Sequence, residues 1–152
     1  MTAALGKADI AALIPHAGAM CLLDSVVFWD SRSIVCRATG HREANHPLAC
    51  DGSVDAICGV EYAAQAMAIH GGLTAGRRPK AGYLASVRNV ICHAARLDLA
   101  RDDLEVAATL LATDPGGAIY SFLVRFGDVT ILEGRAAVVI DAARLPIMTP
   151  PP

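Results

Sequence analysis

Residues 53–72, SVDAICGVEYAAQAMAIHGG, form an apolar segment that limits the folds open to this chain. The segment is free of proline and rich in Ala and Met, with Ser53 or Asp55 available as N-cap and Gly71 as C-cap, so it predicts one long helix. Nearly every position from 56 to 69 is apolar or small, whereas a helix on a protein surface keeps a polar face. We therefore expect the rest of the chain to surround this helix.

Strand-like segments before and after the predicted helix can surround it. They are rich in apolar and β-branched residues and are separated by turn sequences such as DPGG at 114–117. Two segments predict a hairpin, at 21–29 and 33–39, and four follow the helix, at 82–90, 104–113, 118–126 and 129–140. A short helix is expected at residues 7–13. The pattern predicts an α+β domain made of a hairpin, the long helix and then an antiparallel meander.

The chain has enough apolar material for one domain. Its 152 residues are 54% hydrophobic and 18% charged, and a chain of this length buries about two-thirds of the surface that it exposes when unfolded. We expect a single domain over residues 1–145. Residues 146–152, PIMTPPP, are expected to form a flexible tail, because consecutive prolines cannot join a strand ladder.

Composition and missing motifs argue against several classes of function. The chain holds 13 Lys and Arg against 15 Asp and Glu, so it lacks the basic excess that nucleic-acid binding needs. Its five cysteines show no CxxC pair and no spacing of the zinc-site kind. No apolar run is long enough to span a membrane, and residues 1–20 do not resemble a signal peptide. We expect a cytoplasmic protein without metal, cofactor, nucleic-acid partner or membrane span.

Two polar residues interrupt the apolar helix. Glu61 and Gln65 are four positions apart and therefore share one helix face. A carboxylate removed from water costs several kcal/mol unless it is paired, protonated or hydrogen-bonded, so a buried Glu61 requires a reason, and acid/base chemistry is one. The alternative is that the helix is less buried than expected and that Glu61 contacts solvent or an arginine.

Five histidines are the candidate bases, because imidazole titrates nearest to neutral pH. His41 and His46 lie in an irregular segment before the helix, and His16 precedes the first predicted strand, all positions from which a side chain can face a pocket. His70 falls in the last predicted helical turn, where we expect it to cap the helix. His93 follows a predicted strand and is expected on the surface.

Three segments resemble the beta-hydroxyacyl-acyl-carrier-protein dehydratases. IPHAGAMCLLDSVV, at 14–27, is similar to their "LPH, then LL and D, then V" segment, and GVEYAAQAMA, at 59–68, is similar to their "VEALAQ" helix. GYLASVRNVICHAARLDLARDDLEVAATL, at 82–110, resembles the strand that closes on that helix and the entry into the next strand. The segments occur in the same order over roughly three-quarters of the chain. EYAAQAMA together with GYLASVR is most similar to the predicted dehydratases of aryl-polyene lipid biosynthesis clusters.

The resemblance implies a hotdog fold, in which an antiparallel sheet curls around one long helix and two such subunits join their sheets edge to edge. It implies a lyase of lipid biosynthesis that acts on 3-hydroxyacyl chains carried by an acyl carrier protein, without a cofactor. In the family, a His of one subunit removes the C2 proton, and a carboxylate on the helix of the other protonates the leaving 3-hydroxyl. Glu61 matches that carboxylate. The partner is a second copy of the chain or a different hotdog subunit.

The resemblance leaves two candidates for the base. His46 is one residue further from Glu61 than the family's histidine is from its carboxylate, and the family's flanking Gly and its Pro-Gly pair are missing here. His16 follows Pro15 as its own motif requires. By resemblance, Gly59 at the helix start, Gln65 and Tyr83 are expected to contact the substrate, and backbone N–H groups near the helix start polarise the thioester carbonyl in the family.

Docking of an acidic carrier protein requires clustered cations near the tunnel mouth. The dense basic cluster is Arg77, Arg78 and Lys80, and Arg88 on the next strand can join it. Two other functions remain open. The same fold can place a carboxylate where it activates water in a thioesterase, and a chain without the usual base can be a catalytically silent subunit of a paired dehydratase.

Overall fold

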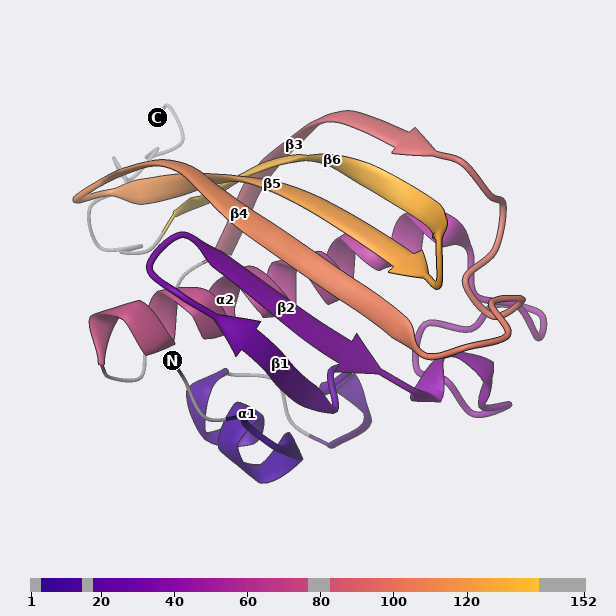
Figure 1. The fold of residues 1–152 in the computed structure, drawn as a ribbon. Coiled ribbons are helices and arrows are strands. Elements are labelled where there is room, and N and C mark those ends of the chain that lie inside the picture. Colours follow the sequence, from indigo (N-terminus) through magenta and orange to yellow (C-terminus); the bar gives the residue numbers. More distant parts are fainter. Residues whose placement is uncertain (1–3, 15–17, 77–82, 140–152) are drawn as a thin grey trace, which may run out of the picture.

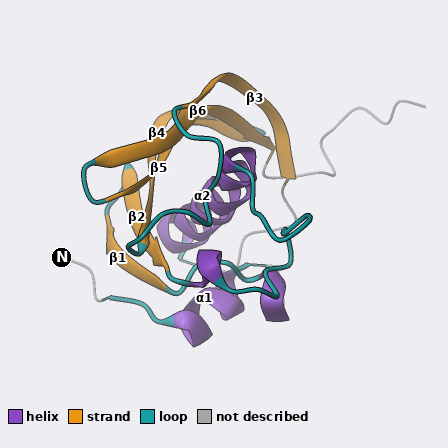
Figure 2. Cartoon of the chain, turned by 90° about the vertical axis from the view of Figure 1, so that its right-hand side faces the viewer, coloured by secondary structure: helices purple, strands orange, loops and turns teal. Residues whose placement is uncertain are grey.

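The chain folds as an antiparallel sheet that curls around one long helix (Figures 1 and 2). The structure, a computed structural model, describes residues 4–14, 18–76 and 83–139. Viewed along the helix, the strands form an open arc with the helix inside it, and the short N-terminal helix lies at the open side (Figure 2). The predicted α+β hotdog architecture is confirmed.

The described residues form a six-stranded sheet with the order β1-β2-β4-β5-β6-β3, in which every neighbouring pair is antiparallel. The strands are β1 (Ser25–Trp29), β2 (Ser33–Ala38), β3 (Tyr83–Cys92), β4 (Leu104–Asp114), β5 (Gly117–Phe126) and β6 (Val129–Val139). The helices are α1 (Lys7–Leu13) and α2 (Gly59–Ala75), with 3-10 turns at Gly18–Met20, Gly40–Arg42 and Ala56–Cys58.

Helix α2 begins later than the sequence predicts. The preceding segment is tied to the loop at 93–103 instead: the N–H of Ala56 donates to the carbonyl of Ala95 at 2.9 Å, and that of Leu97 to Val54 at 2.8 Å. Gly59 then opens the helix against the sheet, where a side chain would collide with Leu132. Any residue other than glycine at position 59 would therefore force the Leu132 side chain to move.

Helix α2 also ends later than predicted. Gly71 does not terminate it, because Gly72 is buried, Leu73 packs against the core and the hydroxyl of Thr74 donates to the carbonyl of His70. The helix ends at Gly76, whose φ of 68° is left-handed and whose N–H bonds back to the carbonyl of Leu73. His70 consequently lies inside the helix, more than a turn from its end.

One strand lies elsewhere than a simple meander would place it. β4, β5 and β6 form the predicted meander, but β3 pairs with β6 at the far edge, and β4 pairs with β2. The reason is the loop at 93–103, which covers the start of α2 before the chain returns as β4. Because this loop is long and bonds to the segment before α2, it cannot form the tight turn that a β3–β4 hairpin requires.

The core lies between the inner face of the sheet and α2. Alternate residues along the strands, such as Val106, Phe122 and Val124, are buried against the helix. Most of α2 is buried as well, and its less buried positions in the first three turns are Val60, Glu61, Ala64 and Ala68. The prediction of a helix surrounded on most sides is confirmed.

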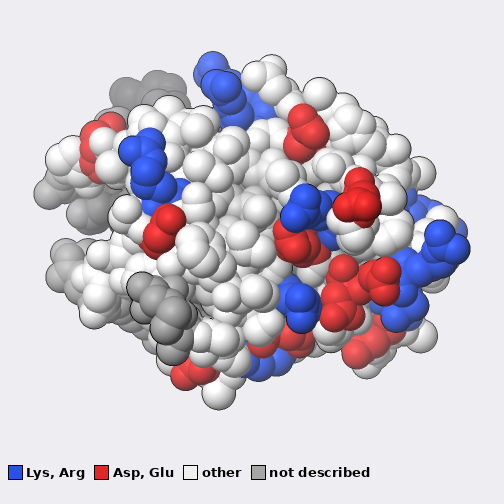
Figure 3. Space-filling view, in the orientation of Figure 1, with Lys and Arg blue, Asp and Glu red and all other residues white. Residues whose placement is uncertain are grey.

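The two edges of the sheet differ. The free side of β1 is covered in part by the N-terminal segment, where Leu5 and Val26 exchange backbone hydrogen bonds at 3.2 and 2.9 Å. At the opposite edge, β3 presents exposed side chains that include Val87 and Ile91, exposed by 39% and 50%. In the space-filling view the outer sheet face is largely uncharged at its centre, and charges of both signs gather toward one end (Figure 3). No described helix is long and apolar enough to cross a membrane.

Candidate functional site

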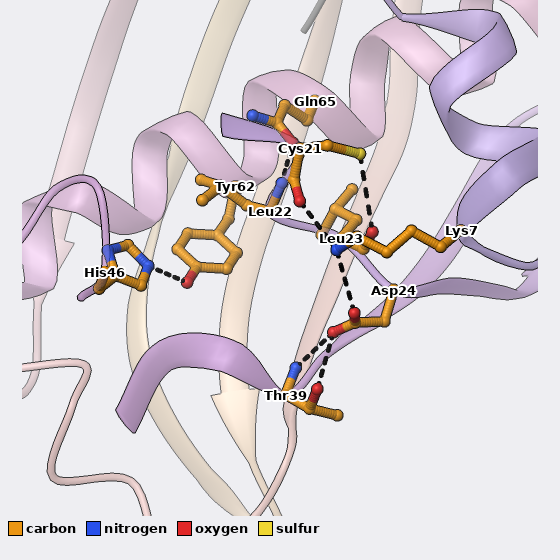
Figure 4. A network of polar contacts seen from close by, with 9 residues as sticks. All are labelled: Lys7, Cys21, Leu22, Leu23, Asp24, Thr39, His46, Tyr62 and Gln65. Carbon is orange, nitrogen blue, oxygen red and sulfur yellow. Dashed lines mark hydrogen bonds and ion pairs between the residues drawn. The ribbon is translucent and has the colours of Figure 1, made fainter. Parts of the chain in front are cut away.

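A group of polar side chains lies at the first two turns of α2 (Figure 4). Gln65 is fully buried, its Oε1 accepts the N–H of Leu22 at 2.9 Å, and its Nε2 donates to the carbonyl of Met20 at 2.7 Å. The same Nε2 lies 3.2 Å from Oε1 of Glu61. Gln65 therefore binds the segment before β1 to the helix and contacts Glu61, as the shared helix face predicts.

Glu61 lies in the first turn of α2 and is half-buried. Its position is suited to proton exchange with a bound molecule, since the carboxylate is fixed by Gln65 yet not sealed from solvent. The expectation that Glu61 is catalytic stays a prediction.

His46 and Tyr62 form a buried pair between the loop before α2 and the first turn of that helix. Nε2 of His46 lies 2.8 Å from the hydroxyl of Tyr62, and Nδ1 accepts the backbone N–H of Leu48 at 3.0 Å. Their side chains are 6% and 1% exposed. Burial, and next the nearby His41, lower the pKa of His46, and burial raises the pKa of Tyr62. Both ring nitrogens of His46 are thus engaged within its own chain.

The pair lines a pocket of about 180 Å³ between the loop before α2 and the segment before β1. Its walls are formed by Lys7, Gly18, Ala19, Cys21, Leu22, Asp24, Thr39, Gly40, Glu43, Asn45, His46, Pro47 and Tyr62.

Asp24 organises one wall of this pocket. Its carboxylate accepts the backbone N–H and the hydroxyl of Thr39 at 2.7 and 3.0 Å, and lies 3.1 Å from Nζ of Lys7. Burial alone would raise the pKa of Asp24, but the hydrogen bonds from Thr39 and Lys7 outweigh it and hold the pKa below its usual range. Asp24 stays an anion that ties α1 and the end of β2 together.

His41 is buried between two loops, a position that the sequence does not reveal. It is 1% exposed, and its Nε2 lies 3.0 Å from the carbonyl of Ala100. Its Nδ1 has no hydrogen-bond partner among the described residues. The side chain joins the loop before α2 to the loop at 93–103 and does not face the pocket's lining.

His70 does not cap α2 as the sequence predicts. Its ring is fully buried, Nδ1 lies 2.7 Å from the hydroxyl of Tyr120, and Nε2 lies 2.9 Å from the carbonyl of Asp30. The expectation is wrong because the helix continues to Ala75 and turns this position toward the sheet. His93 is exposed, as predicted, and its Nε2 lies 3.2 Å from the carboxylate of Glu133.

The remaining predicted site residues are spread over the chain. Gly59 opens α2 beside Glu61, and Tyr83 begins β3. Arg88 is exposed on β3, directly opposite Arg135 on β6. His16 and the basic cluster of Arg77, Arg78 and Lys80 lie outside the described residues. Within the described ranges, no three His, Cys, Asp or Glu side chains are grouped so that they could hold a metal ion.

Tyr62 is the site residue that the sequence analysis missed. The signal was present, because a tyrosine in a helix expected to be buried needs a hydrogen-bond partner for its hydroxyl. What the sequence could not supply was the identity of that partner, which depends on how the loop before α2 folds.

The family of the chain follows from comparison with known proteins. A family model described as "ApeP-like: ApeP dehydratase" matches residues 8–146. The chain belongs to the ApeP-like dehydratase family. The resemblance found in its motifs is therefore confirmed. No curated protein matches the sequence significantly.

Solved structures support the fold of this member of the ApeP-like dehydratase family. The dehydratase heterocomplex ApeI:P from Xenorhabdus doucetiae is 21% identical, with a TM-score of 0.77 over 87% of this chain and 90% of that one. An HP0420 homologue from Helicobacter felis is 16% identical, with a TM-score of 0.62 over 91% and 89%. Thioesterase HI1161 from Haemophilus influenzae is 11% identical, with a TM-score of 0.56 over 75% of each chain.

Proposed function

We propose that this chain is a subunit of a dehydratase that eliminates water from 3-hydroxyacyl thioesters carried by an acyl carrier protein. The observation that carries the proposal is Glu61, a half-buried carboxylate in the first turn of an otherwise apolar helix, in a chain of the ApeP-like dehydratase family. Glu61 gives its proton to the leaving 3-hydroxyl while a base removes the C2 proton. Water departs and a C2=C3 double bond forms.

The working unit is a pair of hotdog subunits joined at β3. Of the two sheet edges, β1 is covered in part by the backbone bonds between Leu5 and Val26, whereas β3 shows no such bond along its free side among the described residues, and an open edge readily pairs with another strand. Val87 and Ile91 supply apolar surface for the contact. The ApeI:P structure is itself a heterocomplex of dehydratase subunits, which supports a partner of the same fold. Sedimentation should give a mass above that of the 15.8 kDa monomer, and a persistent monomer at micromolar concentration contradicts pairing.

Arg88 and Arg135 offer a docking place for the acidic carrier. They face each other across β3 and β6, both exposed, and neither has an ion-pair partner in the described part of the chain. Like charges in direct cross-strand register repel, and an anionic partner relieves that repulsion. A hollow of about 360 Å³ adjoins Arg135, and its lining includes Asn89, Thr109, Ser121 and the acidic Glu133.

Charge reversal tests the docking place. Arg135→Glu, on β6 and away from the pairing edge, should raise KM for the carrier-bound substrate and weaken its salt dependence, while leaving turnover of a small thioester unchanged. Arg32→Glu, an exposed arginine at the opposite edge of the sheet, is the matched control. Equal carrier kinetics in all three proteins would exclude docking here.

One assay tests the reaction itself. The purified chain, alone and with a co-expressed hotdog partner, is incubated with a 3-hydroxyacyl thioester while enoyl product and free thiol are followed. Enoyl product that falls on the order of a hundredfold in Glu61→Gln supports the proposal, because glutamine keeps the shape but cannot cycle a proton. Glu133→Gln, the same change at an exposed glutamate, should leave the rate of enoyl formation unchanged. Free thiol instead indicates a thioesterase, and neither product with the partner present indicates a silent subunit.

A further inference from the structure

The hydrogen bonds around His46 fix which of its nitrogens carries a proton. The backbone N–H of Leu48 is a donor and points at Nδ1 at 3.0 Å, so Nδ1 must accept with its lone pair. In the neutral ring the proton is then on Nε2, which lies 2.8 Å from the hydroxyl oxygen of Tyr62. His46 donates this bond and Tyr62 accepts it.

The direction of that bond leaves the proton of the Tyr62 hydroxyl available. No other hydrogen bond of this hydroxyl is found within the described ranges. A buried O–H without an acceptor costs free energy, and this one belongs to a side chain that lines the 180 Å³ pocket. The arrangement suits an acceptor atom of a molecule bound in the pocket.

We propose that Tyr62 donates a hydrogen bond to the thioester carbonyl oxygen of the bound substrate, and that His46 is a positioning residue for Tyr62 and not the base. The inference rests on the proposed dehydratase function. As the base takes the C2 proton, negative charge grows on that oxygen, and the Tyr62 O–H stabilises it. The C3–O bond then breaks, water leaves with the proton from Glu61, and Tyr62 keeps its own proton. The base is His16 or a group of the second subunit.

The surroundings of His46 keep it neutral. Protonation would place an Nδ1–H against the N–H of Leu48. Burial and the neighbouring His41 lower the pKa of His46, and Glu43 and Asp98 oppose them less strongly. With Nδ1 accepting from Leu48, a neutral His46 donates its Nε2–H to Tyr62.

The first experiment examines His46 without reference to turnover. In the full chain labelled with ¹⁵N-histidine, His46→Gln assigns the His46 signals, and spectra are recorded from about pH 5.5 to about pH 8. We expect a neutral form with the proton on Nε2 at neutral pH, and the onset of protonation at a lower pH than for an exposed imidazole. A His46 that is cationic, or that carries its proton on Nδ1, at neutral pH overturns the inference.

The second experiment examines Tyr62 by kinetics in the paired enzyme. Tyr62→Phe should lower kcat by about a hundredfold, the usual cost of one such donor, with the pH profile unchanged. His46→Ala should resemble it, whereas His46→Gln, which can still donate an N–H to Tyr62, should retain most of the turnover. Tyr120→Phe is the matched control. A Tyr62→Phe variant with parental kcat, or a His46→Gln variant that loses the acidic limb of the pH profile, overturns the inference.

A third measurement separates this inference from the proposed function. A pantetheine derivative in which an amide replaces the thioester offers the same carbonyl acceptor and does not react. Weaker binding to Tyr62→Phe than to the parent supports the donor role even if the parent forms no enoyl product, a result that would refute only the dehydratase proposal. Equal binding together with equal turnover in the two proteins refutes the donor role.

Discussion

Tyr62 and His70, both on helix α2, each belong to a buried histidine–tyrosine pair. The two pairs are hydrogen-bonded in opposite directions. In the first pair, Leu48 donates to His46, so the imidazole donates to Tyr62. In the second, His70 must donate from Nε2 to the carbonyl of Asp30, because a carbonyl only accepts, so its Nδ1 accepts from Tyr120.

The consequence lies in the tyrosine protons. Tyr120 donates its O–H to His70, so the hydroxyl proton of this pair already has an acceptor in the described part of the chain. Tyr62 accepts a hydrogen bond from His46, so its own O–H can be donated into the pocket that it lines. Chemically similar pairs therefore differ in what they leave available: the hydroxyl of Tyr120 is used within its pair, whereas that of Tyr62 can still donate, as our proposal requires. Three predictions test this difference between the two pairs.

The largest effect on stability is expected for His70→Ala. The change leaves a cavity and removes the partners of the Tyr120 hydroxyl and the Asp30 carbonyl, so the free energy of unfolding should fall by about 3 kcal/mol. Urea unfolding measures it. His93→Ala, at an exposed ring, should stay within about 0.5 kcal/mol of the parent. A His70→Ala protein as stable as the parent would mean that this pair supports nothing.

Removing the two tyrosine hydroxyls should have similar costs in stability and different costs in activity. Tyr120→Phe and Tyr62→Phe each leave one buried polar group unpaired, which is worth about 1 to 2 kcal/mol in unfolding free energy. Only Tyr62→Phe should also reduce the turnover of the folded enzyme. Comparable turnover losses in the two variants would show that the pairs do not differ in role.

The sequence predicts the fold more completely than it predicts the site. A helix apolar around its whole circumference requires a wrapping sheet, and Glu61 with Gln65 follows from a spacing of four. The place of β3 does not follow, because it depends on the loop at 93–103 covering the start of α2. The direction of the His46–Tyr62 bond does not follow either, since it is set by where the backbone N–H of Leu48 points.

The smallest effect is expected from pH, and both pairs should contribute to it. The pKa values of His46 and His70 are lowered in the folded chain, chiefly by burial, and the Asp30 backbone and carboxylate oppose this at His70. Below the unfolded pKa of about 6.5 the unfolded chain therefore binds more protons than the folded chain. Stability should be full above that pH and should decline as the pH falls toward the folded pKa values.

Replacing one histidine at a time assigns this decline. Urea midpoints for the parent, His70→Gln and His46→Gln are compared between about pH 7.5 and about pH 5.5. Each variant should be less stable than the parent at the higher pH and should lose less stability on acidification, because glutamine does not titrate. A parent whose midpoint is constant over this range, or variants that decline as steeply as the parent, would show that the two imidazoles are not held neutral by the fold.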